Sequence, residues 1–321
     1  MKVLGKVSLS DIKIMCCISS KNIIDSIPQD SPCTGVAWFS SYESKLKSID
    51  SLTVNLTRIC IYNDKSYSYY YENLRTKKID DFINDLCQMI DDKRIDVLIF
   101  DNMYLPYDPI VYDDSGYENA MQTRIHELFK KIQIKNPNTL YGLMLRAVPD
   151  PGFNLPYLEP VVPFFVYPAC DLVDCDYYDD VTEMPSQDPA DQVEEFVKAI
   201  VSKVKSSKIY LVIQIGVYSS KLYDGPLNAD TYTTFCSVKP SKYRRFCIDY
   251  LSNFYKKGKL VSTYKLAGAF LYTYDFDDYH CKCGCGCYAA TTAINAGVQG
   301  SPEPELTKCD KTWTLRYKDR K

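Results

Sequence analysis

The sequence predicts a single (β/α)8 barrel, and three observations support this fold class. Short apolar runs rich in β-branched residues alternate with segments whose apolar residues recur at helical spacing, a pattern typical of parallel β/α units. Eight such runs can be counted, which is the number of strands in this barrel. The length of 321 residues and the hydrophobic content of 46% suit one domain, 1–321, with a sizeable core.

The eight predicted strands share short length and apolar, β-branched composition: 12–18, 35–40, 58–62, 96–101, 139–148, 161–167, 209–218 and 268–276. The predicted helices share apolar residues three and four apart: 79–92, 120–134, 190–205, 242–256 and 287–295. The connections 21–32 and 42–53 are too short for full helices, so we expect the early helices to be shortened. An open doubly wound sheet is the alternative, but no Gly-rich phosphate-binding turn follows the first strand.

Long loops are expected on the face of the barrel that carries function. Pro- and Asp-rich stretches at 149–160 and 174–189 follow the predicted strands five and six, and a tyrosine run at 67–71 follows strand three. In a barrel, the loops after the strands form the functional face. Only residues 219–241 separate strand seven from its predicted helix, so no sizeable inserted domain is expected.

Composition excludes two classes of partner. A net charge of −3 leaves no basic surface for nucleic acid. No apolar run approaches the roughly 18 residues of a membrane span. We also expect no cofactor.

Cysteine usage predicts an extracellular protein. The 14 cysteines are too many for an ordinary cytosolic enzyme and indicate disulfide bonds formed in an oxidising compartment. Asn55 begins the sequon Asn-Leu-Thr and is the predicted glycosylation site. Gly5 and Lys6 interrupt the apolar stretch that a signal peptide needs, which suggests mature or recombinant numbering or a gene model missing its start.

The predicted fourth strand, IDVLIFDNMY, resembles that of family 18 glycoside hydrolases, the chitinase family. The family pattern is Asp-x-x-Asp-x-Asp-x-Glu followed by Tyr. Asp96, Asp101 and Tyr104 match it. Ile99 stands in place of the middle Asp, and Met103 stands in place of the proton-donating Glu.

The predicted last strand also resembles this family, whose Gly-Gly-x-x-x-Trp run leads into Asp-x-Asp-Asp. Ala267 and Gly268 stand for the glycines, and Tyr272 stands where the family has the Trp that floors the sugar site. The acidic tail is matched by Asp275, Asp277 and Asp278.

Strands six and seven carry weaker likenesses. In VPFFVYPA, Tyr167 keeps the tyrosine of the family's Met-Thr-Tyr-Asp, while Pro168 displaces the aspartate. In VIQIGVYS, Tyr218 matches the tyrosine of Gly-Ile-Pro-x-Tyr-Gly, with Gln214 replacing a Gly and Gly216 replacing the Pro.

The resemblance also implies disulfide bonds. Cys33-Thr34 resembles the family's Cys-Thr-His, whose cysteine is usually bonded to one on strand one, here Cys16 or Cys17. The loop after the last strand often carries a cysteine in the family. A set spaced by one residue follows it here: Cys281, Cys283, Cys285 and Cys287. This spacing suits zinc poorly, so we predict disulfides, with partners such as Cys236 or Cys309, and no metal.

The resemblance implies a protein without glycosidase activity. A methionine has no titratable proton, and general acid catalysis typically contributes ~10²–10⁴ in rate. Asp101 remains, but it has no Glu to which it could relay a proton. The alternative is a weak hydrolase that uses a carboxylate of the loop after strand four as acid: Asp108, Asp113 or Asp114.

The predicted ligand is an N-acetylglucosamine-type glycan, or else a protein partner, at the barrel mouth. The expected contacts are Asp101, Tyr104, Tyr167, Gln214, Tyr218 and Tyr272. Three alternatives stay open: Asp101 hydrogen-bonded to Tyr167, Tyr272 used for core packing instead of stacking on a sugar ring, and Met103 as filler or as a pocket wall.

Overall fold

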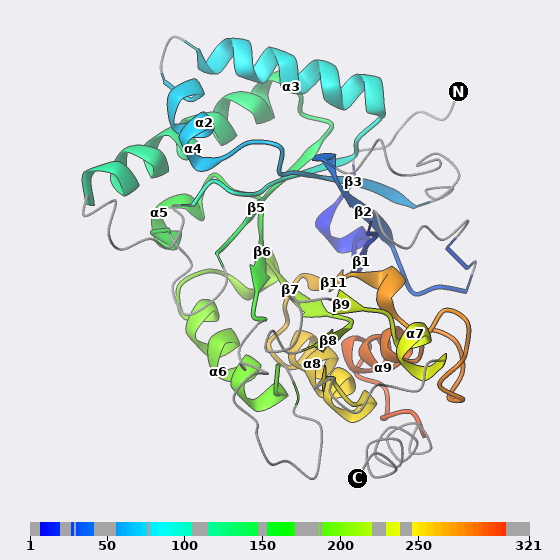
Figure 1. Ribbon diagram of the computed structural model, residues 1–321. Helices are drawn as coiled ribbons and strands as arrows, with labels where there is room; N and C mark the ends of the chain where they lie inside the picture. Colours follow the sequence, from blue (N-terminus) through cyan, green and yellow to red (C-terminus); the bar gives the residue numbers. More distant parts are fainter. Residues whose placement is uncertain are drawn as a thin grey trace.

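The chain forms a closed barrel of eight parallel strands (Figure 1). The computed structural model describes residues 7–19, 27–28, 30–41, 56–75, 78–104, 115–146, 153–170, 186, 188–219, 229–237 and 246–305. The strand order is β1-β11-β7-β6-β5-β4-β3-β2, and β1 pairs with both β2 and β11. This closure confirms the predicted (β/α)8 barrel and excludes the open doubly wound sheet.

The barrel strands are β1 (Ile14–Cys17), β2 (Gly35–Phe39), β3 (Thr57–Tyr62), β4 (Val97–Phe100), β5 (Leu140–Met144), β6 (Phe164–Pro168), β7 (Ile209–Gln214) and β11 (Gly268–Tyr272). The helices of the described part are α2 (Tyr67–Asn73), α3 (Ile79–Lys93), α4 (Ser115–Lys135), α5 (Leu155–Leu158), α6 (Ala190–Val201), α7 (Tyr232–Ser237), α8 (Leu251–Thr263) and α9 (Ala289–Val298). Short 3-10 turns are η1 (Leu9–Asp11), η4 (Ser206–Lys208) and η6 (Tyr274–Phe276).

Side chains alternate along each barrel strand between two hydrophobic clusters. On β4, Val97 and Ile99 belong to a cluster that fills the lumen, whereas Leu98 and Phe100 belong to one that also contains the buried faces of the helices. The strand period of two residues produces this alternation. Any residue that continues a strand can therefore be assigned to the lumen or to the outer layer.

The helices cover the barrel because each has one apolar face. On α3 the buried residues recur at helical spacing: Ile79, Phe82, Ile83, Leu86 and Ile90. Burying each large aliphatic side chain stabilises the fold by about 1.5–3 kcal/mol. The helix ends at Arg94, whose left-handed backbone (φ 52°) prevents further helical hydrogen bonding.

The connection after strand seven differs from its prediction. β7 ends at Gln214, and the chain enters a small antiparallel sheet ordered β10-β8-β9, formed by β8 (Val217–Ser219), β9 (Ala229–Asp230) and β10 (Phe246–Cys247). The predicted helix 242–256 begins only at Leu251. Phe246 and Cys247, which lie within the predicted helix, instead form β10 and pair with β8.

Two short helices lie where loops were expected. The tyrosine run after strand three forms α2, whose first turn is capped by the Ser66 hydroxyl accepting from Tyr69 N–H at 3.4 Å. The Pro- and Asp-rich stretch after strand five contains α5. Most of the connections 21–32 and 42–53 lies outside the described residues, so the shortened early helices remain a prediction.

Helices α8 and α9 pack against each other without side chains between them at two glycines. A methyl group on Gly258 would overlap the carbonyl of Ile294, and one on Gly297 would overlap the carbonyl of Tyr255. This close approach brings the carboxyl ends of both helices together at the end of the barrel where the strands begin, which we call the lower end; the mouth is the opposite end, where the strands finish.

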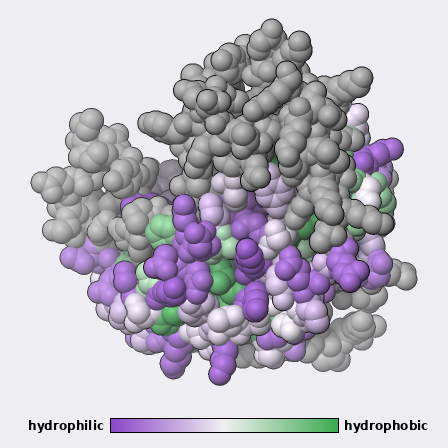
Figure 2. Space-filling view, turned by 90° about the horizontal axis from the view of Figure 1, so that it is seen from below, coloured by the Kyte–Doolittle hydropathy of each residue, from purple (hydrophilic) through white to green (hydrophobic). Residues whose placement is uncertain are grey.

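The described residues form a mainly polar surface on the face of the molecule seen from below. Hydrophilic residues predominate on the face shown in Figure 2, with hydrophobic residues scattered among them. None of the helices in the described part has the length and apolar character needed to cross a membrane.

Candidate active site at the barrel mouth

The carboxyl ends of the strands bring four chemically active residues to the mouth. Gln214 ends β7 and pairs in register with Tyr272, which ends β11. Asp101 and Arg146 follow β4 and β5 at the positions that continue the lumen-facing residues Ile99 and Met144. The upper end of the lumen is therefore polar, whereas the rest is filled by apolar side chains.

Asp101 is a buried carboxyl that titrates close to neutral pH. Its side chain accepts a hydrogen bond from Asn102 N–H at 2.7 Å, and its own N–H donates to the Tyr62 carbonyl at 3.2 Å. Burial raises its pKa to about 6, against the hydrogen bond from Asn102. Asp101 can thus donate a hydrogen bond in mild acid and accept one at higher pH.

Tyr104 lies within electrostatic reach of Asp101. Burial is the main reason that its pKa rises to about 12; the negative charge of Asp101 adds to the rise, and the positive charge of Arg146 opposes it. The phenol therefore stays protonated and can donate a hydrogen bond at physiological pH. Our sequence reasoning missed Arg146, although a lone basic residue at the end of an apolar strand was a usable signal.

Tyr272 is an aromatic side chain at the mouth. It is half-buried and packs edge-on against Phe39, with ring centroids 5.9 Å apart at 89°. Its carbonyl accepts a hydrogen bond from Ile215 N–H at 2.6 Å, and its peptide bond to Thr273 is cis. It packs on the lumen cluster and keeps part of its surface exposed, so core packing and contact with a ligand are compatible.

The family motif led us to expect Met103 in the lumen, but its side chain does not lie there. Asn102 adopts a left-handed backbone (φ 59°), which ends the strand alternation after Asp101. Met103 is fully buried in the outer hydrophobic cluster, while Ile99 stays in the lumen below Asp101. The position has no proton to donate, and its side chain packs as filler in the barrel wall.

Tyr167 is likewise directed away from the mouth. On β6, Phe164 and Val166 belong to the lumen cluster, whereas Tyr167 belongs to the outer cluster and is 2% exposed. No hydrogen bond joins Tyr167 to Asp101 in the described structure, so that alternative is not realised. Burial raises the pKa of Tyr167 to about 12.

The remaining predicted site residues are spread over the molecule. Asp96 lies at the lower end of β4, where its carboxylate accepts from Arg58 N–H at 2.8 Å and locks β3 to β4. Tyr218 belongs to β8, outside the barrel wall, and its backbone pairs with Cys247 and Ala229. Asn55 lies outside the described residues, as do the loop acids Asp108, Asp113 and Asp114.

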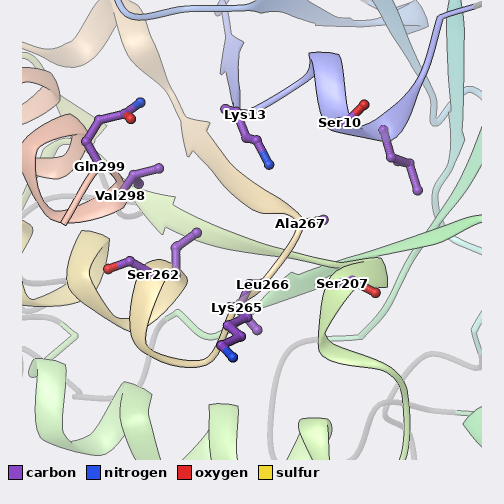
Figure 3. A pocket seen from close by; sticks show the side chains of 11 residues that line it. Ser10, Lys13, Ser207, Ser262, Lys265, Leu266, Ala267, Val298 and Gln299 are labelled. Atoms are coloured by element: carbon purple, nitrogen blue, oxygen red, sulfur yellow. The ribbon is translucent and has the colours of Figure 1, made fainter.

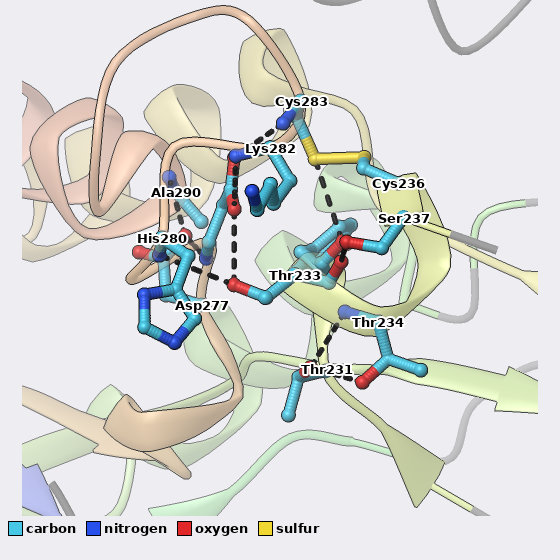
Figure 4. The surroundings of a disulfide bond; sticks show 12 residues. Thr231, Thr233, Thr234, Cys236, Ser237, Asp277, His280, Lys282, Cys283 and Ala290 are labelled. Atoms are coloured by element: carbon cyan, nitrogen blue, oxygen red, sulfur yellow. Dashed lines mark hydrogen bonds between the residues drawn. A yellow bond between two sulfur atoms is a disulfide. The ribbon is translucent and has the colours of Figure 1, made fainter.

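The acidic tail after β11 contains two carboxylates with full sets of partners. Asp277 accepts hydrogen bonds from Asp278 N–H (2.7 Å), Ala290 N–H (3.2 Å) and Thr291 N–H (2.7 Å), the last two at the start of α9. Asp278 accepts from Lys282 N–H (2.8 Å), Cys283 N–H (2.6 Å) and the Thr233 hydroxyl (3.0 Å). These contacts, drawn partly in Figure 4, tie the cysteine-rich loop to α7 and α9.

Asp275 differs from its two neighbours in the tail. One carboxylate oxygen accepts from Ser19 N–H at 2.8 Å, and the other is buried without a hydrogen-bond partner. The side chain is inaccessible to solvent, and burial raises its pKa to about 7. Because it joins the segments that follow β1 and β11, Asp275 lies at the mouth end of the barrel.

Disulfide bonds involve the cysteines at which the family resemblance had placed them. Cys33 is bonded to Cys16, while Cys17 is free and buried. Cys236 on α7 is bonded to Cys283 (Figure 4), and Cys281 to Cys287. Cys285 and Cys247 are also disulfide-bonded. The described residues contain no cluster of three or more metal-binding side chains.

Solved structures with the same architecture cover nearly the whole chain. The Group IV chitinase of Ostrinia furnacalis in complex with allosamidin superposes with a TM-score of 0.69 and 15% identity, over 91% of this chain and 100% of that one. Catalytic domain 2 of the Group II chitinase of the same species superposes with a TM-score of 0.68 and 16% identity, over 92% of this chain and 98% of that one. Human YKL-39, described as a pseudo-chitinase with retained chitooligosaccharide binding, gives 0.65 and 14%, over 90% and 100%.

No protein-family model and no curated protein sequence matches the chain. The likeness is therefore one of fold, because the structures superpose over nearly the whole chain although sequence identity is low. The chain has the fold of the family 18 glycoside hydrolases and the chitinase-like proteins related to them.

Proposed function

We propose that this protein is a secreted chitinase-like protein that binds oligosaccharides of N-acetylglucosamine at the barrel mouth without hydrolysing them. The observation that carries the proposal is the pairing of Tyr272 with Gln214 at the top of the lumen, together with Ile99 and Met103 in place of two acids of the strand-four motif. An aromatic side chain and an amide adjoin at the ends of β11 and β7, a carboxyl follows β4, and position 103 supplies no proton donor.

Sugar binding is supported by the chemistry of the mouth residues. A partly exposed aromatic ring can cover the apolar face of a pyranose. Asp101, Tyr104 and Gln214 supply acceptors and donors for hydroxyl and acetamide groups. The same kind of ligand is named for human YKL-39, which shares this fold.

Absence of hydrolysis is supported by two replacements in the strand-four motif, one on β4 and one just after it. Ile99 fills the lumen with a hydrocarbon where the motif has an Asp, and Met103 is turned into the outer layer. Secretion is supported by the disulfide bonds, and glycosylation at Asn55 remains a prediction.

Calorimetric titration with chitin tetramers and hexamers tests binding. Tyr272→Ala should weaken the affinity about tenfold, because an aromatic pair or stacking contact is worth ~0.5–1.5 kcal/mol beyond its buried area. Tyr157→Ala on α5 is the control, since this tyrosine is 42% exposed and lies outside the mouth. No detectable heat with millimolar ligand would refute the glycan form of the proposal and leave a protein partner at the mouth.

The competing function is weak hydrolysis with a substitute acid. Asp101 favours it in one respect, because a carboxyl with a pKa of about 6 is partly protonated in mild acid. A fluorogenic chitooligosaccharide should show no turnover at pH 5 or pH 7. Turnover that Asp101→Asn or Asp108→Asn abolishes would overturn the non-enzymatic assignment.

A further inference from the structure

A cavity of about 510 Å³ opens at the lower end of the barrel, opposite the mouth (Figure 3). It is bounded by η1, the residue before β1, η4, the end of α8 with the turn into β11, and the end of α9. Its volume falls within the roughly 300–1,000 Å³ of small-molecule sites. Nothing in the proposed sugar binding uses this cavity.

The lining combines a hydrocarbon surface with positive charge. The apolar part comes from Leu9, Val261, Leu266, Ala267 and Val298. Lys13 and Lys265 are the charged residues, and neither Asp nor Glu lines the cavity. Within the described residues, neither ammonium group forms an ion pair with a carboxylate. Such a lining suits a molecule with one negative group and an apolar body.

Lys13 is the better placed of the two lysines. Its N–H donates to the Thr34 hydroxyl at 2.8 Å, and its carbonyl accepts from Ala269 N–H at 3.0 Å, so its backbone is fixed between neighbouring strands. In Figure 3 its ammonium group is directed toward the middle of the lining residues, whereas that of Lys265 is directed away from it; both lysines are exposed residues. Lys13 can therefore reach a bound anion, and Lys265 can add attraction at the entrance.

The two lysines could serve only to neutralise nearby helix ends, but the helix ends balance only part of their positive charge. The carboxyl ends of α8 and α9 reach the cavity at Ser262 and Gln299, and cations stabilise such ends. Each helix end is equivalent to about half a negative charge, whereas each ammonium carries a full positive one. A positive balance of about one charge therefore remains for a ligand.

We propose that this cavity binds an amphipathic carboxylate, of the type of a medium-chain fatty acid. The carboxylate would accept hydrogen bonds from Lys13, and the hydrocarbon chain would cover the apolar lining. The site lies at the other end of the barrel from the sugar site, so the two are separate.

Calorimetric titration of the oxidised full chain with decanoate, below its micelle concentration, tests the proposal. Decanoate should bind, and the neutral decanol and the short anion acetate should each bind at least tenfold more weakly. Lys13→Met should weaken decanoate about tenfold, because a hydrogen bond to a charged group is lost, and Lys265→Met should weaken it less. Lys256→Met is the matched control, since Lys256 is exposed on α8 away from the cavity lining.

The outcomes separate specific binding from its alternatives. Loss of decanoate binding in Ser207→Trp, where a large side chain is added at the exposed rim, would locate the ligand in the cavity. No binding by the wild-type chain, or equal weakening by Lys13→Met and Lys256→Met, would overturn the proposal. Loss of chitin-oligomer binding in Lys13→Met would also contradict it, because the two sites would then not be separate.

Discussion

The ends of β4 and β11 both carry acidic residues, but these residues have different surroundings. After β11, Asp277 and Asp278 each accept three hydrogen bonds and connect α9, α7 and the cysteine-rich loop. After β4, Asp101 accepts one from the neighbouring backbone, and apolar residues occupy the other positions of the motif. The carboxylates with most protein partners are those that hold the structure, whereas at the end of β4 a single carboxyl with one hydrogen-bond partner lies among apolar residues.

The largest effect is expected from removing Asp278. Asp278→Ala should lower the free energy of unfolding by about 3–5 kcal/mol, because two backbone N–H groups and a hydroxyl lose a buried charged acceptor. Urea-induced unfolding of the oxidised protein measures this. Glu195→Ala, at a side chain that is 72% exposed, should change stability by less than about 0.5 kcal/mol. Equal effects of the two variants would show that the hydrogen bonds of Asp278 do not hold the structure.

Replacing Asp275 should stabilise the protein at neutral pH, whereas replacing Asp278 should destabilise it. Burial raises its pKa from 3.8 to about 7, so the folded chain binds the proton more tightly than the unfolded chain. This contribution to stability is complete below pH 4 and is lost as pH rises through 7, by up to about 4 kcal/mol. Asp275→Asn should therefore be more stable than the wild type at pH 7 and similar to it at pH 4.

Unfolding by urea at pH 4, 5.5 and 7 checks this prediction. The difference between wild type and Asp275→Asn isolates the one carboxyl from the others that titrate. If the variant is less stable than the wild type at pH 7, the unpartnered oxygen has an ionic partner and the comparison with Asp277 fails.

Restoring the acid on β4 should not restore activity. Met103→Glu should destabilise the fold by about 2–4 kcal/mol, because the new carboxyl enters an apolar layer without a partner. Met103→Leu should cost less than about 1.5 kcal/mol. A chitooligosaccharide assay of Met103→Glu should show no turnover. A stable and active Met103→Glu would show that position 103 faces the lumen.

The barrel was predictable because its signals are local. Short apolar runs and helical spacing depend on neighbours within a few residues, so the starts of the strands and of α3, α6 and α9 were found close to their observed positions. The predicted strands 139–148, 209–218 and 268–276 extend past the observed ends at Met144, Gln214 and Tyr272. The cysteines at 16, 33, 281, 283, 285 and 287 could be identified from their motif positions. The family resemblance also gave Cys16 or Cys17 as the partner of Cys33 and Cys236 as a partner of the cysteine-rich loop, and the structure contains the Cys16–Cys33 and Cys236–Cys283 bonds. The Cys281–Cys287 bond within the loop was not predicted, because pairing there depends on how the loop folds back on itself.

The amino-acid sequence by itself determined the barrel, its alternating layers and the missing proton donor at position 103. Only the tertiary structure decided which residues face the lumen once a strand has ended. A single left-handed residue, Asn102, directs Met103 outward, and the parity of β6 directs Tyr167 away from the mouth. The isolation of Asp275 and the cavity at Lys13 likewise join segments far apart in sequence, where no local pattern can report them.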